Sequence, residues 1–316
     1  MALDHYVSQV HLKNFYAAEL GERMYGTHKK NLKTFPCDAL SQCRIEDGST
    51  NPYLQEPRVI EDFLKDVEPR YNKAVQALRD DQIDQNVIYT IAGFAAYVDT
   101  CSPAAMRLAS GPLRSTVETT AAVLEAKGLI PPAPNAFGGK TLTELLESGG
   151  IVVNIDPKYP QSLGIQTIEK RLSLWGNSRW DILLNTHSES PFFTSDYPVV
   201  IERSRDPRVL DRVIPLAPDL ALRIYPDYEV RRSHDLGFSK LRYRRVQASR
   251  QDVMRLNAGI VQCAESTIYS SHNRPWVNSF IGRHRSFRVE PHTLKLPQGT
   301  GQHLFMTRMI TPFVHD

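Results

Sequence analysis

Residues 59–78 read VIEDFLKDVEPRYNKAVQAL, and this stretch decides how the N-terminal half of the chain folds. Its apolar residues recur at steps of three and four, which places them along one face of a helix. They are Val59, Ile60, Phe63, Leu64, Val67, Tyr71, Ala74, Val75 and Leu78. We predict that this stripe, with Phe63 in it, belongs to the core. Pro69 has no N–H group and its ring strikes the preceding turn, so the helix should kink or divide there.

Other segments extend this pattern, and then the sequence changes character. We predict a helix at about 85–100, a third at 104–127 that Gly111-Pro112 interrupts, and a late one at 250–268. From about residue 150, short β-favouring runs predominate, at 151–153, 180–184, 192–193, 199–201 and 220–224. Helices followed by strands favour an α+β fold. We expect 1–316 to form a single globular domain, with an N-terminal helical part (about 52–172) packed on a small mixed or antiparallel sheet (about 173–316).

The composition is typical of a folded protein of the cytoplasm. The chain has 316 residues, 41% of them hydrophobic, but no run of about 18 apolar residues, so no membrane contact is expected. Its start, MALDHYVSQVHLKNF, lacks the apolar stretch of a signal peptide. The four cysteines form no CxxC pair, which predicts neither disulfides nor a zinc site. No metal ligands are predicted, and the sequence leaves cofactors and the oligomeric state open.

The net charge of +3 hides an asymmetry along the chain. Residues 1–200 carry 19 Lys and Arg against 24 Asp and Glu, or −5, whereas residues 201–316 carry 19 against 11, or +8, and the two sum to +3. A basic C-terminal third suggests an anionic partner such as nucleic acid or a nucleotide. The commoner meaning of a few extra arginines is a solvated basic surface.

Aromatic residues interleave with the cations of this basic third, in runs such as 242–245 and 272–276. Arginine forks bind phosphates and aromatic faces stack on unpaired bases, so the combination suits single-stranded RNA. The expected contacts are Arg242, Arg244, Arg245, Arg274 and Trp276. The alternative is a strand whose alternate arginines face water, and the sequence does not separate the two interpretations.

Two polar side chains stand out at the start of the chain. His5 can act as an acid or a base near neutral pH without further tuning. Gln9 lies one helical turn later if this segment is helical, and would then share a face with His5. The structural alternative is that His5 ties the N-terminus to a backbone group.

A second polar group, Thr194, Ser195 and Asp196, follows two phenylalanines at a predicted strand end. Hydroxyls and carboxylates in such places commonly cap turns through hydrogen bonds to the backbone. The functional alternative has Asp196 orienting His5, with Thr194 or Ser195 contacting phosphate. No Gly-x-Ser-x-Gly pattern surrounds Ser195, which argues against a nucleophilic serine. If the functional interpretation holds, His5 and residues 194–196 must meet in space.

Several motifs together resemble the family known as domain of unknown function 4238. The opening HYVSQVHLKNF (residues 5–15) is similar to its N-terminal signature, with Ser8 for the usual proline and His11 for an aromatic residue. Further matches are IEDFL (60–64) through Glu68, WDILL (180–184), FTSDYPV (193–199), PLAP (215–218) and a helix from 256–257. The family usually has Asn in place of Tyr197. The resemblance covers roughly residues 5–270 and implies candidate positions but no activity.

The leading hypothesis is a phosphodiester-cleaving enzyme, an RNA-directed nuclease of a bacterial toxin or defence system. His5 would be its general acid or base, Asp196 would orient His5, and arginines of the basic third would hold phosphate. The alternative is a noncatalytic nucleic-acid- or nucleotide-binding module that uses the same arginines. Convergence of His5, Gln9, Asp196 and an arginine in one pocket favours catalysis, whereas a flat basic face favours binding.

Overall fold

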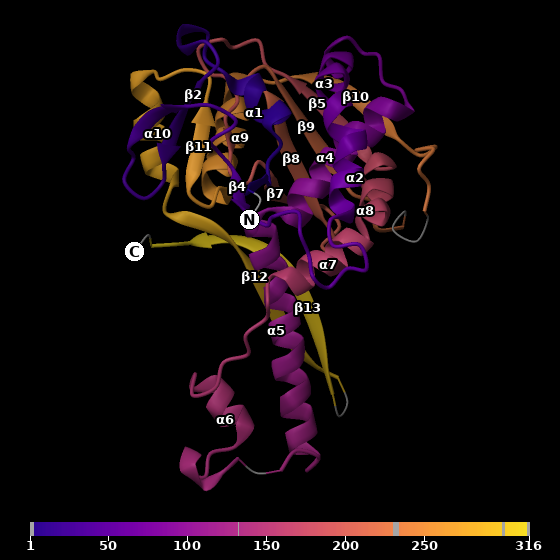
Figure 1. Ribbon diagram of the computed structural model, residues 1–316, viewed down its shortest axis with the longest axis vertical. Helices are drawn as coiled ribbons and strands as arrows, with labels where there is room; N and C mark the ends of the chain where they lie inside the picture. The colour runs from indigo at the N-terminus through magenta and orange to yellow at the C-terminus, as the bar shows by residue number, and fades with distance from the viewer. Residues whose placement is uncertain (1–2, 132, 230–233, 299–300, 315–316) are drawn as a thin grey trace.

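The computed structural model describes residues 3–131, 133–229, 234–298 and 301–314, and its architecture is α+β, as predicted (Figure 1). The larger sheet has five strands in the order β10-β5-β9-β8-β7. Their bounds are β5 (Arg179–Leu184), β7 (Val200–Arg203), β8 (Leu210–Ala217), β9 (Leu220–Tyr225) and β10 (Arg242–Gln247). Strand β10 runs parallel to β5 and the other pairs are antiparallel, so the sheet is mixed.

A second sheet joins the two ends of the chain. It has the order β3-β2-β11-β6, from β2 (Met24–His28), β3 (Thr34–Cys37), β6 (Thr194–Ser195) and β11 (Thr267–Ser270). The N-terminal segment also forms a pair of short strands, β1 (Leu3–His5) and β4 (Arg44–Glu46), and the helix α1 (Gln9–Leu12). The sequence predicted none of these short strands; β2 and β3 form a local hairpin, whereas β6 and β11 pair with segments far away along the chain.

The segment 59–78 divides at its proline, as predicted. Helix α2 (Val59–Val67) and helix α3 (Tyr71–Arg79) are separated by a 3-10 turn (Glu68–Arg70) that contains Pro69. Most of the apolar stripe is buried, but Phe63 is only half-buried and Val59 is exposed. These two side chains lie at the edge of the core, because the outer turns of α2 pack less deeply than α3.

Helix α4 (Gln85–Cys101) is the central helix of the protein. Almost every residue along it is buried, and the Asp84 side chain caps its start by accepting from the Val87 N–H at 2.8 Å. Helices α3, α7 (Lys158–Gln166) and α8 (Ile168–Gly176) pack around it. Helix α9 (Arg250–Cys263), which matches the predicted late helix, packs against β6, β7 and α10 (Pro275–His284).

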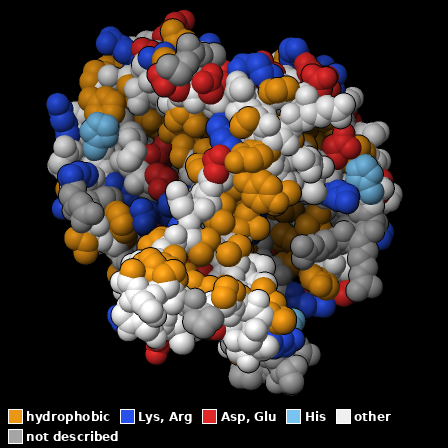
Figure 2. Space-filling model, turned by 60° about the horizontal axis from the view of Figure 1, so that its bottom comes forward, with side chains coloured by type: hydrophobic (Ala, Val, Ile, Leu, Met, Phe, Trp, Pro, Cys, Tyr) orange, Lys and Arg blue, Asp and Glu red, His pale blue; other side chains and the backbone are white. Residues whose placement is uncertain are grey.

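Helix α5 (Pro103–Ala126) runs without a break through Gly111-Pro112, so the predicted interruption is wrong. Gly111 is instead a contact point, because a Cβ there would lie 2.3 Å from the Pro291 ring of strand β12. The outer half of α5, the helix α6 (Leu142–Glu147) and the hairpin of β12 (Phe287–Gln298) and β13 (Gly301–Pro312) project from the body (Figure 1). Figure 2 shows hydrophobic side chains gathered where this projection meets the body.

Two predicted strands are not formed. Residues 151–153 are irregular and largely exposed, because they belong to the connection that leaves α6. Phe192 and Phe193 are fully buried but lie in an extended segment just before β6. Their side chains belong to the hydrophobic core. The backbone does not pair as a strand at Phe193, because its N–H donates to the Asn257 side chain at 2.9 Å.

Two further features follow from the composition. No helix in the described part of the chain is both long enough and apolar enough to cross a bilayer. Cys37, Cys43, Cys101 and Cys263 are all buried and unpaired, as their irregular spacing predicted.

We predict that the buried end of the 59–78 segment contributes strongly to stability. Leu78→Ala should lower the free energy of unfolding by about 2–5 kcal/mol, because a fully buried side chain leaves a cavity. Val59→Ala is the matched control, since Val59 is 39% exposed, and it should change the free energy by about 0.5 kcal/mol or less. Urea denaturation of both variants measures this difference, and equal losses would show that the buried face is misassigned.

Candidate anion pocket

The polar residues predicted at the N-terminus, His5 and Gln9, lie on the first strand and at the start of the first helix. Pairing of β1 with β4 sets His5 opposite Arg44, and the His5 Nε2 lies 3.1 Å from the carbonyl oxygen of Leu40. This contact is the structural alternative considered above. Gln9 begins α1 and is half-buried. Among the described residues, no hydrogen bond joins His5 or Gln9 to Asp196, so their catalytic roles stay predictions.

Asp196 caps a turn. Its buried carboxylate accepts from the backbone N–H groups of Glu265, Ser266 and Thr267 at 2.8–3.0 Å, and from the Ser266 hydroxyl at 2.7 Å. Burial raises the pKa of Asp196, and the bonds from Ser266 and Thr267 oppose that rise. Ser195 Oγ accepts from the Tyr197 N–H at 3.2 Å. Asp196 and Ser195 therefore make the turn-capping bonds that such residues commonly make.

The histidine that does reach residue 194 is His11. Its ring is fully buried, with Nδ1 2.8 Å from the Tyr71 hydroxyl and Nε2 2.8 Å from the Thr194 hydroxyl. The ring also stacks on Phe94 with centroids 4.7 Å apart. Burial lowers the pKa of His11 to about 3, so the ring is neutral at physiological pH. Sequence spacing alone had drawn attention to His5 because it stands outside the apolar pattern.

The basic and aromatic residues of the C-terminal third do not form one surface. Arg242, Arg244 and Arg245 lie on β10 at one side of the molecule, whereas Arg274 and Trp276 lie at α10 on the opposite side (Figure 1). The two runs belong to different elements, an edge strand and a helix, so one flat face does not hold all five residues, and their contact with nucleic acid stays a prediction.

Most of these side chains already have partners within the protein. The Arg244 guanidinium forms two hydrogen bonds with buried Asp181, at 2.6 and 2.8 Å. Arg274 pairs with Glu189, and the Trp276 ring stacks on Phe193 with centroids 5.7 Å apart. Arg245 donates to a backbone carbonyl at 2.5 Å. Arg242 is exposed on β10. These contacts leave the strand interpretation as the better account of the arginines on β10.

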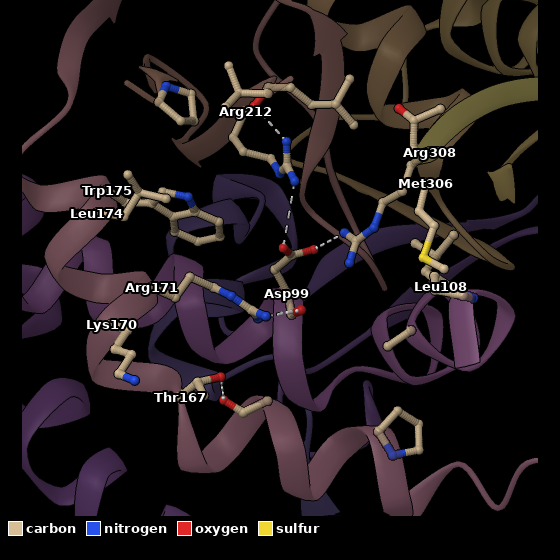
Figure 3. A pocket seen from close by; sticks show the side chains of 18 of the residues that line it. Asp99, Leu108, Thr167, Lys170, Arg171, Leu174, Trp175, Arg212, Met306 and Arg308 are labelled. Atoms are coloured by element: carbon tan, nitrogen blue, oxygen red, sulfur yellow. Dashed lines mark hydrogen bonds and ion pairs between the residues drawn. The ribbon is translucent and has the colours of Figure 1, made fainter. Parts of the chain in front are cut away.

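A different group of charged side chains converges around Asp99 (Figure 3). Asp99 lies near the end of α4, and its carboxylate is 3% exposed. Arg308 of β13 donates to Asp99 Oδ1 at 2.5 Å, and the Tyr197 hydroxyl donates to the same oxygen at 2.7 Å. Arg212 of β8 approaches the other carboxylate oxygen at 4.0 Å. These groups come from four separate segments of the chain.

Arg171 of α8 completes the cluster. Its Nη1 donates to the Asp99 backbone carbonyl at 2.9 Å and to the Thr100 hydroxyl. Arg212 shares its face of β8 with the apolar Leu210 and Ile214, because strand side chains alternate, and this register points a charge toward the core. The side chains of Arg212 and Arg308 are only 12% and 18% exposed.

The electrostatics of the cluster keep every member charged. Burial alone would raise the pKa of Asp99, but the charges of Arg308, Arg212 and Arg171 outweigh it and hold the pKa well below its usual range. Burial lowers the pKa of Arg171 and of Arg212, and the Asp99 charge opposes this. Three guanidinium groups thus surround one carboxylate, which leaves a formal excess of two positive charges.

The cluster lies at the wall of a cavity of about 800 Å³. Helices α5, α7 and α8 supply much of the lining, and α4, β8, β13 and the loops at 207–209 and 226 also contribute. The ionisable residues of this lining, among those described, are Asp99, Lys170, Arg171, Arg208, Arg212 and Arg308, five cations and one anion. Its size is that of cavities that hold small-molecule ligands. No cluster of three His, Cys, Asp or Glu side chains in the described residues is arranged to hold a metal ion.

Comparison with known families agrees with the motifs in the sequence. The family described as "Protein of unknown function (DUF4238)" matches residues 4–274. The chain belongs to this family. No curated protein and no solved structure matches the chain. Asp99, Arg171, Tyr197 and Arg212 lie inside the matched range, whereas Arg308 lies on the hairpin that follows it.

The pocket was not predicted from the sequence, because no local motif indicates it. Asp99 is one acid in an otherwise apolar helix, and that isolation was the available signal, since charges are seldom buried without partners. The partners lie 72 to 209 residues further along the chain. Only the fold brings them together.

We predict that His11 makes stability depend on pH. The unfolded chain binds a proton at His11 near pH 6.5, but the folded chain binds it only near pH 3. Between these values the unfolded state holds more protons, so stability falls as pH falls, by up to about 1.4 kcal/mol per pH unit.

His11→Phe removes this titration and keeps an aromatic ring against Phe94. Its free energy of unfolding, measured in urea from pH 7 to pH 5, should decline less steeply than that of the wild type. His292→Gln, at an exposed position of the hairpin, should leave the wild-type slope unchanged. A His11→Phe slope equal to that of the wild type would contradict a buried neutral His11.

Proposed function

We propose that this protein binds a small anion with two negative charges, a phosphate or phosphate monoester, in the pocket at Asp99. The observation that carries the proposal is the excess of two positive charges in the cluster of Arg171, Arg212 and Arg308 around one carboxylate. Removing charges from water costs several kcal/mol per ion unless partners compensate it. One carboxylate compensates one guanidinium, and a dianion would compensate the other two.

The hydrogen bonds of the three arginines leave donors for such a ligand. Arg171, Arg212 and Arg308 each bond to the protein through Nη1. In the described part of the chain, Arg212 Nε is buried without a hydrogen-bond partner, and Arg212 Nη2 has only the 4.0 Å approach to Asp99. An unpaired buried N–H group is costly, so an acceptor oxygen at this place stabilises the site. Guanidinium forks match the oxygens of phosphate in geometry as well as charge.

The same pocket favours binding over phosphodiester cleavage. Its described lining includes no histidine, cysteine or serine, and of its two threonines, Thr167 and Thr307, the first already donates its hydroxyl to the Leu163 carbonyl at 2.8 Å. Asp99 is held ionised by its partners and is a poor proton donor or acceptor at neutral pH. We therefore prefer the noncatalytic alternative, with a small phosphate ligand in place of RNA. The RNA-directed nuclease stays a prediction that the Asp99 pocket does not support.

We predict saturable binding of inorganic phosphate and pyrophosphate at low ionic strength. Arg212→Gln should weaken it about 10- to 100-fold, because hydrogen bonds to charged groups contribute about 1.5–3 kcal/mol. Arg255→Gln is the matched control, since Arg255 is exposed on α9 and pairs only within its helix with Asp252. Isothermal titration calorimetry of the three proteins provides the test.

Circular dichroism and thermal melting establish that each variant is folded before titration. The proposal predicts strong binding by the wild type and by Arg255→Gln, and a loss in Arg212→Gln. It fails if the wild type binds neither anion, or if Arg212→Gln binds both as tightly as the wild type does.

A further inference from the structure

The walls of the Asp99 pocket indicate which kind of phosphate it holds, given the anion site proposed above. Most of the described lining that is not charged is aliphatic. The aliphatic residues include Leu108 and Leu113 of α5, Leu163 of α7, Leu174 of α8 and Met306 of β13. Leu174 lies beside Lys170 and Arg171 on α8, but the aliphatic residues of α5 and β13 lie together at one side of the cluster. Figure 3 shows Leu108 and Met306 beside Arg308, on the side of the cluster away from Lys170.

Aromatic and amide groups, which recognise nucleobases, are scarce in this lining. The described lining has no Phe, Tyr, His, Asn or Gln, and its one aromatic residue, Trp175, is 4% exposed. The guanidinium groups of Arg171 and Arg212 lie about 6 Å from the Trp175 ring, at 6.0 and 5.9 Å. A base would find neither a free aromatic face nor side-chain amides for its edge, so the pocket disfavours a nucleotide.

Two apolar side chains at the pocket are exposed to water. Leu163 is 40% exposed and Met306 is 37% exposed, although both line the cavity. A ligand with a hydrocarbon portion would remove this surface from water, and each buried methylene contributes to affinity. The hydrocarbon must lie within reach of the guanidinium groups, since Met306 and Arg308 share one face of β13.

We propose that the ligand is an aliphatic phosphate monoester, with its phosphate on Arg171, Arg212 and Arg308 and its single hydrocarbon chain along the α5, α7 and Met306 wall. The charged cluster and the aliphatic wall are two halves of one site. The phosphate supplies the missing negative charge, and the chain covers Leu163 and Met306.

The test compares ligands that share a phosphate but differ in the attached group. Ethyl phosphate, octyl phosphate and AMP are titrated calorimetrically into the wild type, with octyl phosphate kept below the concentration at which it forms micelles. Each added methylene should strengthen binding about threefold to fourfold, so octyl phosphate, which has about six more methylenes, should bind on the order of 1,000-fold more tightly than ethyl phosphate. AMP should bind no more tightly than ethyl phosphate, because its base gains no partner.

Two variants assign the two halves of the ligand to the two halves of the site. Leu163→Asn should weaken the binding of octyl phosphate and leave the binding of ethyl phosphate unchanged. Arg212→Gln should weaken the binding of both. Arg255→Gln should change neither. Because the ligand series in the wild type is itself decisive, a variant that fails to fold does not remove the test.

The outcomes separate this inference from the proposed function. If ethyl and octyl phosphate bind equally well, or AMP binds most tightly, the anion site stands and the aliphatic ligand is refuted. If none of the phosphates binds, both proposals fail together. Octyl phosphate binding that neither Leu163→Asn nor Arg212→Gln weakens would place the ligand elsewhere on the protein and overturn the inference.

Discussion

The Asp99 carboxylate and the arginines around it join side chains from four elements of the fold. Asp99 lies at the end of the central helix α4, Arg171 on α8, Arg212 on the larger sheet and Arg308 on the C-terminal hairpin. Breaking a buried pair by removing one partner leaves an uncompensated charge, which typically costs about 3–5 kcal/mol. The position of the hairpin therefore depends on this cluster as well as on the packing of β12 against α5.

Local patterns predicted the elements that the chain specifies locally. The stripe in residues 59–78, the division at Pro69 and the central helix at 85–101 all follow from apolar spacing and from proline chemistry. Burial of α4 on nearly every side could also be expected from its lack of charges other than Asp99. In contrast, β2, β6 and β11 are short strands whose pairing joins residues near both ends of the chain, and no local pattern encodes such partners. The unbroken α5 was missed because the packing of Pro291 against Gly111 comes from the distant hairpin.

The candidate sites show the same division between local and distant information. Asp196 was noticed correctly as a polar residue in an apolar setting, but its partners are the amides of residues 265–267, which turn it into a cap. His11 was passed over as a substitute for an aromatic residue, although its ring joins α3 to β6 through Tyr71 and Thr194. Through His11, the N-terminal signature therefore contributes to the packing of α1 against the second sheet. A single buried charge such as Asp99 leads to the proposed site, whereas in the arginine-rich runs Arg244 and Arg274 already pair with Asp181 and Glu189.

The central claim is that three guanidinium groups around Asp99 need an anion. Crystals of the wild-type protein grown with tungstate, a phosphate analogue with a strong anomalous signal, test it most directly. The account predicts one dominant anomalous peak within hydrogen-bonding reach of Arg171, Arg212 and Arg308, and its disappearance in Arg212→Gln crystals. An empty pocket in the wild type, with tungstate bound only at exposed arginines elsewhere, would contradict the account.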